Sequence, residues 1–153
     1  YKVQRVNAPR LPFKFYEDLN AFKLFMLDVG LMGAMAETSA ESMLVGDNVF
    51  SEYKGAFTEL FVFTQLKSRH FSLYYHAVES STIEIDFLTQ WHDRVIPIEV
   101  KAEVNVKAKS LHTFINNNPE LQGLRFSMLP YKKQDWVINV PLYACLVPFD
   151  YYR

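Results

Sequence analysis

The sequence has little that could cross-link the chain or anchor it in a membrane. Cys145 is its only cysteine, and a single thiol cannot form an internal disulfide, so the composition favours a reducing compartment, which we take to be the cytoplasm. No apolar run approaches the ~20 residues that a membrane-spanning helix needs, and no signal peptide is visible. The sequence therefore predicts no membrane partner.

The sequence also lacks an excess of charge of either sign. Its formal net charge is -1, so any contact with nucleic acid must come from a local patch rather than from an overall field. Its four histidines show no metal-ligand spacing, and we expect them to be structural or to lie on the surface. Neither a basic surface nor a histidine cluster thus indicates a function.

What the chain does have is apolar surface to bury. Half of its 153 residues are hydrophobic and 16% are aromatic, which predicts one compact folded domain with a sizeable core. Cys145, which lies between Ala144 and Leu146, is expected to be a buried apolar residue in a strand. The chain shows no internal repeat and no low-complexity tract.

The first third of the chain is the least regular part. Residues 1–21 carry two prolines and scattered charge, which predicts an extended lead-in, and residues 22–27 predict a short buried strand. Asp28 is placed to cap a short helix. Residues 37–54 are mixed and mostly small or polar, so we expect a loop or a weak helix there.

The rest of the chain alternates between strand and helix patterns. A helix that is apolar nearly all round is expected at residues 55–70, so it should be central and well covered. A second helix is expected at residues 106–116. Strands are predicted at residues 72–78, 82–91, 95–103, 125–129 and 135–147, with a hairpin turn at residues 92–94. This order predicts an α/β fold with a mixed sheet.

Two neighbouring strands carry charged residues that could form a catalytic site. Glu99 and Lys101 are two residues apart on one strand, so both side chains leave the same face. The preceding strand is expected to alternate, with Ile85 and Phe87 on one face and Asp86 on the other. If the two strands pair antiparallel through the hairpin turn, Asp86 lies near Glu99 across the ladder.

Converging carboxylates favour a divalent cation, because the cation relieves the repulsion between like charges. Hard oxygen ligands suit Mg²⁺ or Mn²⁺, and we predict Asp86 and Glu99 as the ligands. Such an ion can activate a water for in-line attack on a phosphodiester, with Lys101 orienting or deprotonating that water or offsetting charge. Glu59, on an apolar stripe of the helix predicted at residues 55–70, is costly to bury alone, and a metal would explain its placement.

Plainer interpretations of the same residues stay open. Alternating Glu and Lys on a strand are commonly solvated, and Glu59 could be a hydrogen-bonded core carboxylate or an exposed residue. Glu84 and Glu103 favour a surface position. The basic residues that follow the site in sequence could form a phosphate-binding rim or serve only solubility; they are Lys107, Lys109, Arg125, Lys132 and Lys133.

The run from Asp86 to the Glu99-Val100-Lys101 tripeptide resembles the PD-(D/E)xK nuclease signature, with Glu59 matching the helix carboxylate that often precedes it. A wider set of segments resembles one family over nearly the whole chain; these are residues 22–31, 55–59, 84–88, 96–101, 109–111 and 141–143. The family is the C-terminal domain of unknown function 4143 of bacterial and archaeal AAA-type ATPases.

This resemblance implies a restriction-endonuclease-like fold, with a mixed β-sheet flanked by helices and a small N-terminal appendage. It implies that residues 1–50 are an appendage or linker from an ATPase module and that residues 51–153 are the nuclease-like domain. ATP would bind in that other module, because this chain has no Gly-x-x-x-x-Gly-Lys-Ser/Thr phosphate loop. The ATPase module would also be a partner of this domain.

Two functions are consistent with the resemblance and the residues. The first is metal-dependent phosphodiester hydrolysis on nucleic acid, which the complete set of Asp, Glu and Lys favours. The alternative is a catalytically inactive module of the same fold that binds DNA or a partner protein and couples it to the ATPase. The near-neutral net charge favours this alternative.

Overall fold

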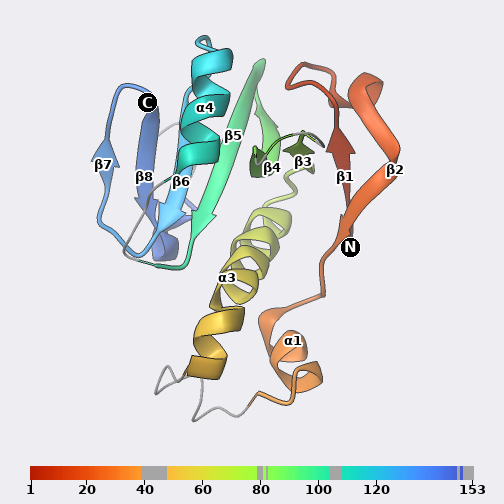
Figure 1. Ribbon diagram of the computed structural model, residues 1–153, viewed down its shortest axis with the longest axis vertical. Helices are drawn as coiled ribbons and strands as arrows, with labels where there is room; N and C mark the ends of the chain where they lie inside the picture. Colours follow the sequence, from red (N-terminus) through yellow and green to blue (C-terminus); the bar gives the residue numbers. More distant parts are fainter. Residues whose placement is uncertain (39–47, 79–80, 82, 104–107, 148, 150–153) are drawn as a thin grey trace.

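The computed structural model describes residues 1–38, 48–78, 81, 83–103, 108–147 and 149. In the described part of the chain, eight strands form one mixed sheet in the order β2-β1-β3-β4-β5-β6-β8-β7 (Figure 1). The strands are β1 (Lys2–Val6), β2 (Glu17–Leu24), β3 (Leu73–Ala77), β4 (Glu84–Trp91), β5 (Arg94–Lys101), β6 (Gly123–Ser127), β7 (Lys132–Lys133) and β8 (Val137–Pro141). The helices are α1 (Val29–Met35), α3 (Asn48–Ser68) and α4 (Lys109–Asn117), with short 3₁₀ helices η1 (Phe13–Tyr16) and η2 (Leu142–Ala144).

The centre of the sheet combines antiparallel and parallel pairs. β3, β4 and β5 pair antiparallel, and β4 joins β5 through a tight turn in which His92 has a φ of 54°. The chain then crosses through α4 and adds β6 parallel to β5, and β8 parallel to β6. The prediction of an α/β fold with a mixed sheet is therefore confirmed, as is the hairpin turn after Trp91.

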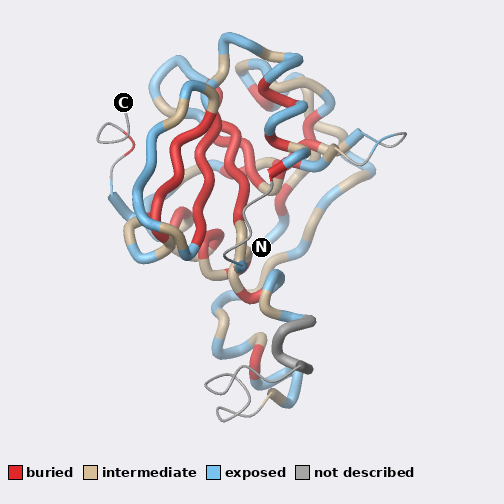
Figure 2. Tube along the Cα trace, turned by 60° about the vertical axis from the view of Figure 1, so that its left-hand side comes forward, coloured by how far each residue is buried: buried red, intermediate tan, exposed pale blue. Residues whose placement is uncertain are grey.

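Helices cover the two faces of the sheet and divide the core into two clusters. The α3 cluster contains Leu60, Val62, Phe63 and Leu66 of α3 together with Phe87, Ile98, Val100 and Phe126 of the sheet. The α4 cluster contains Leu111, Phe114 and Ile115 of α4 together with Ile85, Leu88, Val95 and Val137. Full burial of such side chains contributes about 1.5–3 kcal/mol each, and Figure 2 shows the buried positions concentrated in adjacent strands. The sheet is thus held from both sides.

The N-terminal residues form strands of this sheet rather than an extended lead-in. β1 pairs parallel with β3, and Val3 and Val6 are buried in the core. The predicted buried strand at residues 22–27 is wrong, because β2 ends at Leu24 and lies at the sheet edge with Phe22 47% and Leu24 75% exposed. An apolar run does not reveal whether another layer covers the strand that it forms. A domain boundary at residue 50 stays a prediction, although the sheet includes residues on both sides of it.

Local signals placed most of the helices correctly. The Oδ1 atom of Asp28 accepts a hydrogen bond of 2.8 Å from the backbone N–H of Leu31, which confirms the predicted cap. α3 begins at Asn48, so the end of the expected loop is helical, while residues 39–47 of that loop lie outside the described residues. Among the described residues, no helix is long and apolar enough to cross a membrane.

The C-terminal strand is shorter than its sequence pattern predicted. β8 ends at Pro141 and η2 follows, so Cys145 is buried as expected but lies after a 3₁₀ helix rather than in a strand. Burial raises the pKa of its thiol to about 11, which keeps the group protonated and unreactive at neutral pH. The two-residue strand β7 gave no pattern long enough to be detected in the sequence.

Candidate functional site

A β-bulge positions Asp86 in β4. Tyr74 pairs with Leu88 and His76 pairs with Ile85, so β4 advances three residues while β3 advances two. The bulge places Ile85 and Leu88 in the α4 cluster and Phe87 in the α3 cluster. The predicted alternation with Ile85 and Phe87 on one face is therefore wrong, because an extra residue shifts the side-chain register of one strand.

The carboxylate of Asp86 takes part in the pairing between β4 and β5. Its Oδ2 atom accepts a hydrogen bond of 2.7 Å from the backbone N–H of Val100, beyond the last residue pair of the ladder, Phe87 with Ile98. Burial and, to a lesser extent, the charges of Glu99 and Glu59 raise the pKa of Asp86 to about 7, against the opposing effects of the Val100 N–H group and Lys23. Asp86 is thus a carboxyl group that can gain or lose a proton near neutral pH.

Glu99 and Lys101 extend from β5 as a close ion pair. Their Oε1 and Nζ atoms are 2.5 Å apart, and the Glu99 side chain is 5% exposed. The second oxygen, Oε2, is buried and has no hydrogen-bond partner among the described residues. Burial raises the pKa of Glu99, while Lys101 opposes that rise. An unsatisfied buried carboxylate oxygen is costly, and such an atom indicates a missing partner.

Glu59 of α3 contacts a cation that the sequence analysis did not include. Lys23 of β2 lies 3.1 Å from Glu59 and 2.5 Å from Glu84. Burial lowers the pKa of Lys23, but the two glutamates outweigh this effect and raise it to about 12. The signal was available, because Lys23 is the single charge within the apolar run of residues 22–27. Glu59 is therefore a half-buried, ion-paired carboxylate.

The three predicted metal ligands interact, but they do not form a compact cluster. Both Glu99 and Glu59 raise the pKa of Asp86, so all three carboxylates contribute to the potential at one position. Within the part of the chain that the structure describes, no group of three or more His, Cys, Asp or Glu side chains lies close enough to hold a metal ion. The arrangement offers oxygen ligands for a cation, and Lys23 and Lys101 partly neutralise them.

The other charged residues separate into surface and site positions. Glu103 is exposed and lies 3.4 Å from Lys54, and Glu84 is half exposed. Arg125 is buried in β6 directly beside Glu99 in the register of the parallel pair. Lys109, Arg125 and Lys132 line a hollow of about 450 Å³, whereas Lys107 lies outside the described residues.

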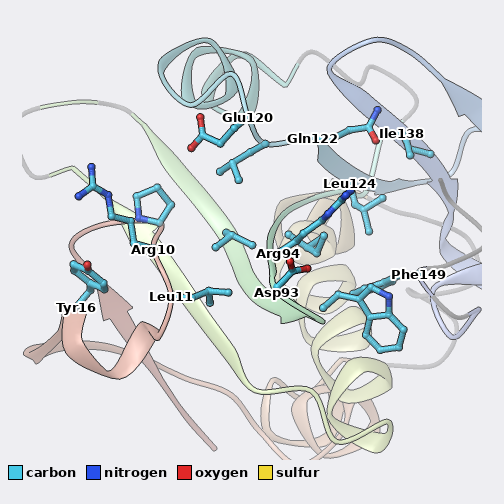
Figure 3. A pocket seen from close by; sticks show the side chains of 15 residues that line it. Arg10, Leu11, Tyr16, Asp93, Arg94, Glu120, Gln122, Leu124, Ile138 and Phe149 are labelled. Atoms are coloured by element: carbon cyan, nitrogen blue, oxygen red, sulfur yellow. The ribbon is translucent and has the colours of Figure 1, made fainter.

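A larger hollow than the one lined by Arg125 lies at the other end of the β4–β5 hairpin. Its volume is about 690 Å³, and it borders the turn residues Asp93 and Arg94 (Figure 3). Arg10 reaches it from the segment before β2, and Glu120 from the loop before β6 (Figure 3). None of the predicted catalytic residues is among the described residues that line it.

One of three comparisons with known proteins identifies a family for this chain. A search of curated proteins and a search of solved structures each found no match. The sequence model of a domain of unknown function, DUF4143, matches residues 54–144, which is more than half of the chain. The matched segment includes Glu59, Asp86, Glu99 and Lys101. The chain therefore belongs to the DUF4143 family.

Proposed function

We propose that this chain is a PD-(D/E)xK-type nuclease domain that hydrolyses phosphodiester bonds of nucleic acid with the help of a divalent cation. The observation that carries the proposal is the buried, unpartnered Oε2 atom of Glu99 beside Asp86 and Lys101. The order α3-β3-β4-β5-α4-β6 supports a restriction-endonuclease-like core, which has a helix, three strands, a helix and a strand. The proposal places this domain in a larger AAA-type ATPase, with ATP bound in the ATPase module.

The donor set fits Mg²⁺ or Mn²⁺, because these ions prefer carboxylate oxygens and Mg²⁺ needs only one or two protein carboxylates. Asp86 and Glu99 would hold the ion, and Glu59 would support it after releasing Lys23. When bound, the ion would supply a water of lowered pKa and would neutralise charge on the phosphate. The free oxygen of Glu99 and the raised pKa of Asp86 are both relieved by a cation.

Lys101 and Asp86 have distinct roles in this proposal. The ion pair with Glu99 fixes the ammonium of Lys101 beside the carboxylates, where it can orient the attacking water and offset phosphate charge. Asp86, with a pKa of about 7, gives up its proton when a cation binds. Metal affinity should therefore increase between pH 6 and pH 8.

The second candidate is a module of the same fold that binds DNA or a partner protein without hydrolysis. The ion pairs of Glu99 with Lys101 and of Glu59 with Lys23 favour it, because both reduce the negative charge that would attract a metal. The lack of a compact ligand cluster among the described residues favours it as well. In this alternative the domain would couple its partner to the ATPase.

Metal titration and plasmid nicking separate the two candidates. We expect Mg²⁺ or Mn²⁺ to bind in a calorimetric titration and to support nicking, and we expect Lys101→Ala to slow nicking about 100-fold or more. Glu103→Gln is the matched control, since Glu103 is exposed and follows the same strand. Nicking that survives Lys101→Ala would rule out the proposed site. If the wild type neither binds metal nor nicks the plasmid, the result would support the binding module.

A further inference from the structure

A second site lies one strand away from the carboxylates. It is a hollow of about 450 Å³, which we call the basic hollow, lined by Ala108, Lys109, His112, Arg125, Leu129, Lys132, Gln134 and Trp136. Three of these residues are Lys or Arg, and no carboxylate is among the described residues that line the hollow. In a chain whose formal net charge is -1, this is a local concentration of positive charge.

Arg125 gives the basic hollow a fixed cation rather than a mobile surface one. It is 6% exposed, and its Nε atom donates a hydrogen bond of 3.0 Å to Oδ1 of Asn139. The amide nitrogen of Asn139 donates to the carbonyl oxygens of Leu129 and Pro130, at 3.1 and 2.9 Å, which sets the orientation of that amide. The guanidinium is therefore held in place before any ligand arrives.

The other two cations of the basic hollow are exposed, unlike Arg125. Lys109 begins α4, whose first turn contains no acidic residue, and Lys132 lies on β7; both lysines are exposed. Trp136 is partly exposed in the same lining and contacts His112 with ring centroids 4.7 Å apart. The hollow thus combines two exposed lysines with a buried guanidinium and a partly exposed aromatic ring.

The register of the sheet joins the basic hollow to the carboxylate site. Arg125 of β6 is the direct neighbour of Glu99 of β5, and the two residues interact electrostatically. Neighbouring strands are about 4.8 Å apart, so the backbone of Arg125, which lines the hollow, lies about one strand spacing from the backbone of Glu99. A ligand that extends along a chain of phosphates can reach both places.

We propose that the basic hollow binds a phosphate of a nucleic-acid strand next to the phosphate that lies at the carboxylate site. The identity of the ligand rests on the proposed function. Arg and Lys form short charge-assisted hydrogen bonds with phosphate oxygens, and the planar fork of Arg fits them in pairs. The ring of Trp136 offers a surface for a neighbouring base. The hollow would set the register of the strand across the site without reading its sequence.

The test measures binding of a short labelled DNA oligonucleotide by fluorescence anisotropy without metal, so that hydrolysis plays no part. Lys132→Glu is compared with Lys133→Glu, which changes the same charge at the next residue of β7 but is not among the described lining residues. We expect Lys132→Glu to weaken binding about tenfold. The plot of the logarithm of the binding constant against the logarithm of the salt concentration should also become less steep by about 0.7–0.9, which corresponds to the loss of one phosphate contact. Lys109→Glu should behave like Lys132→Glu.

A fluorescence measurement provides an independent readout. Trp91→Phe leaves Trp136 as the only tryptophan, because the chain has two. We expect the oligonucleotide to change the emission of Trp136, and inorganic phosphate to compete only weakly.

Equal effects of Lys132→Glu and Lys133→Glu, or no binding of the oligonucleotide, would overturn the inference. Hollow variants that bind like the wild type while nicking persists would leave the proposed function standing. If the hollow variants weaken binding but the wild type shows no nicking, the nuclease proposal would be contradicted and the proposal for the basic hollow would stand.

Discussion

The two ends of the β4–β5 hairpin differ in how far their charged side chains are exposed to water. The turn end borders the larger hollow, of about 690 Å³, and its charged side chains Arg10, Asp93, Arg94 and Glu120 are all exposed. At the other end, Glu99 is buried and Asp86 is half-buried, and both carboxyl groups have raised pKa values. The larger of the two hollows therefore lies at one end of the hairpin, and the carboxyl groups with raised pKa values lie at the other. Water screens exposed charges, whereas a carboxylate that is removed from water keeps a perturbed pKa, as catalytic groups commonly do. The end with Asp86 and Glu99 is therefore the better candidate for chemistry.

The largest expected effect tests this difference with one substitution at each end. Asp86→Asn should reduce metal-dependent nicking about 100-fold or more, because it removes a metal ligand while keeping the shape of the side chain. Asp93→Asn makes the same chemical change in the exposed turn and should leave the rate unchanged. Initial rates of plasmid nicking measure both. Loss of activity in Asp93→Asn alone would move the site to the larger hollow.

A smaller effect should appear in the pH dependence of stability. The pKa of Asp86 is raised from 3.8 to about 7, so between these values the folded state holds more protons than the unfolded state. Stability is therefore fully present below about pH 4 and falls as the pH rises through 7, by about 2–4 kcal/mol from this group. Urea unfolding over a pH series should show this fall.

Two variants and the metal identify the source of that pH dependence. Asp86→Asn should flatten the profile, and Asp93→Asn should keep it. Saturating Mg²⁺ should reduce the loss above pH 7, since the cation takes the place of the proton. A profile of the same slope in Asp86→Asn would show that other groups carry the pH dependence.

The smallest effect concerns Lys23, which pairs with Glu59 of α3 and also acts on Asp86. Lys23 lowers the pKa of Asp86, so Lys23→Met should move the midpoint of the stability profile to higher pH. Lys54→Met is the control, because Lys54 contacts only the exposed Glu103 among the ion pairs of the described residues. A side-chain carboxyl titration by NMR would detect the shift directly. A midpoint that moves to lower pH, or equally in both variants, would contradict the role of Lys23.

The sequence pattern identified the candidate residues but not their surroundings. The spacing of Glu99 and Lys101 on a strand was enough to predict that they leave one face together, and the structure pairs them at 2.5 Å. The bulge at Asp86 was not detectable, because it depends on how β3 pairs with β4 rather than on either strand alone. Lys23 stands out in the sequence as a single charge in an apolar run, but its partners Glu59 and Glu84 could not be predicted, since the three residues come from separate elements.

The sequence also identified the basic residues without showing which of them lie together. Lys109, Arg125 and Lys132 were already candidates for a phosphate-binding rim in the sequence. Their sequence positions could not separate Lys132 from Lys133, because only the β7–β8 pairing decides which lysine borders the hollow. Nor could sequence show that Arg125 is buried and held by Asn139, a residue 14 positions away.

By itself the sequence determined the α/β class, the cap at Asp28 and the identity of the charged residues, because local periodicity and side-chain chemistry act over a few neighbouring positions. Only the tertiary structure decided that residues 2–24 complete the sheet, that Glu99 keeps an oxygen without a partner, and that Arg125 lies beside it. These features depend on which distant segments pack together. Their packing removes water from particular charges, and that desolvation cannot be read from any one segment.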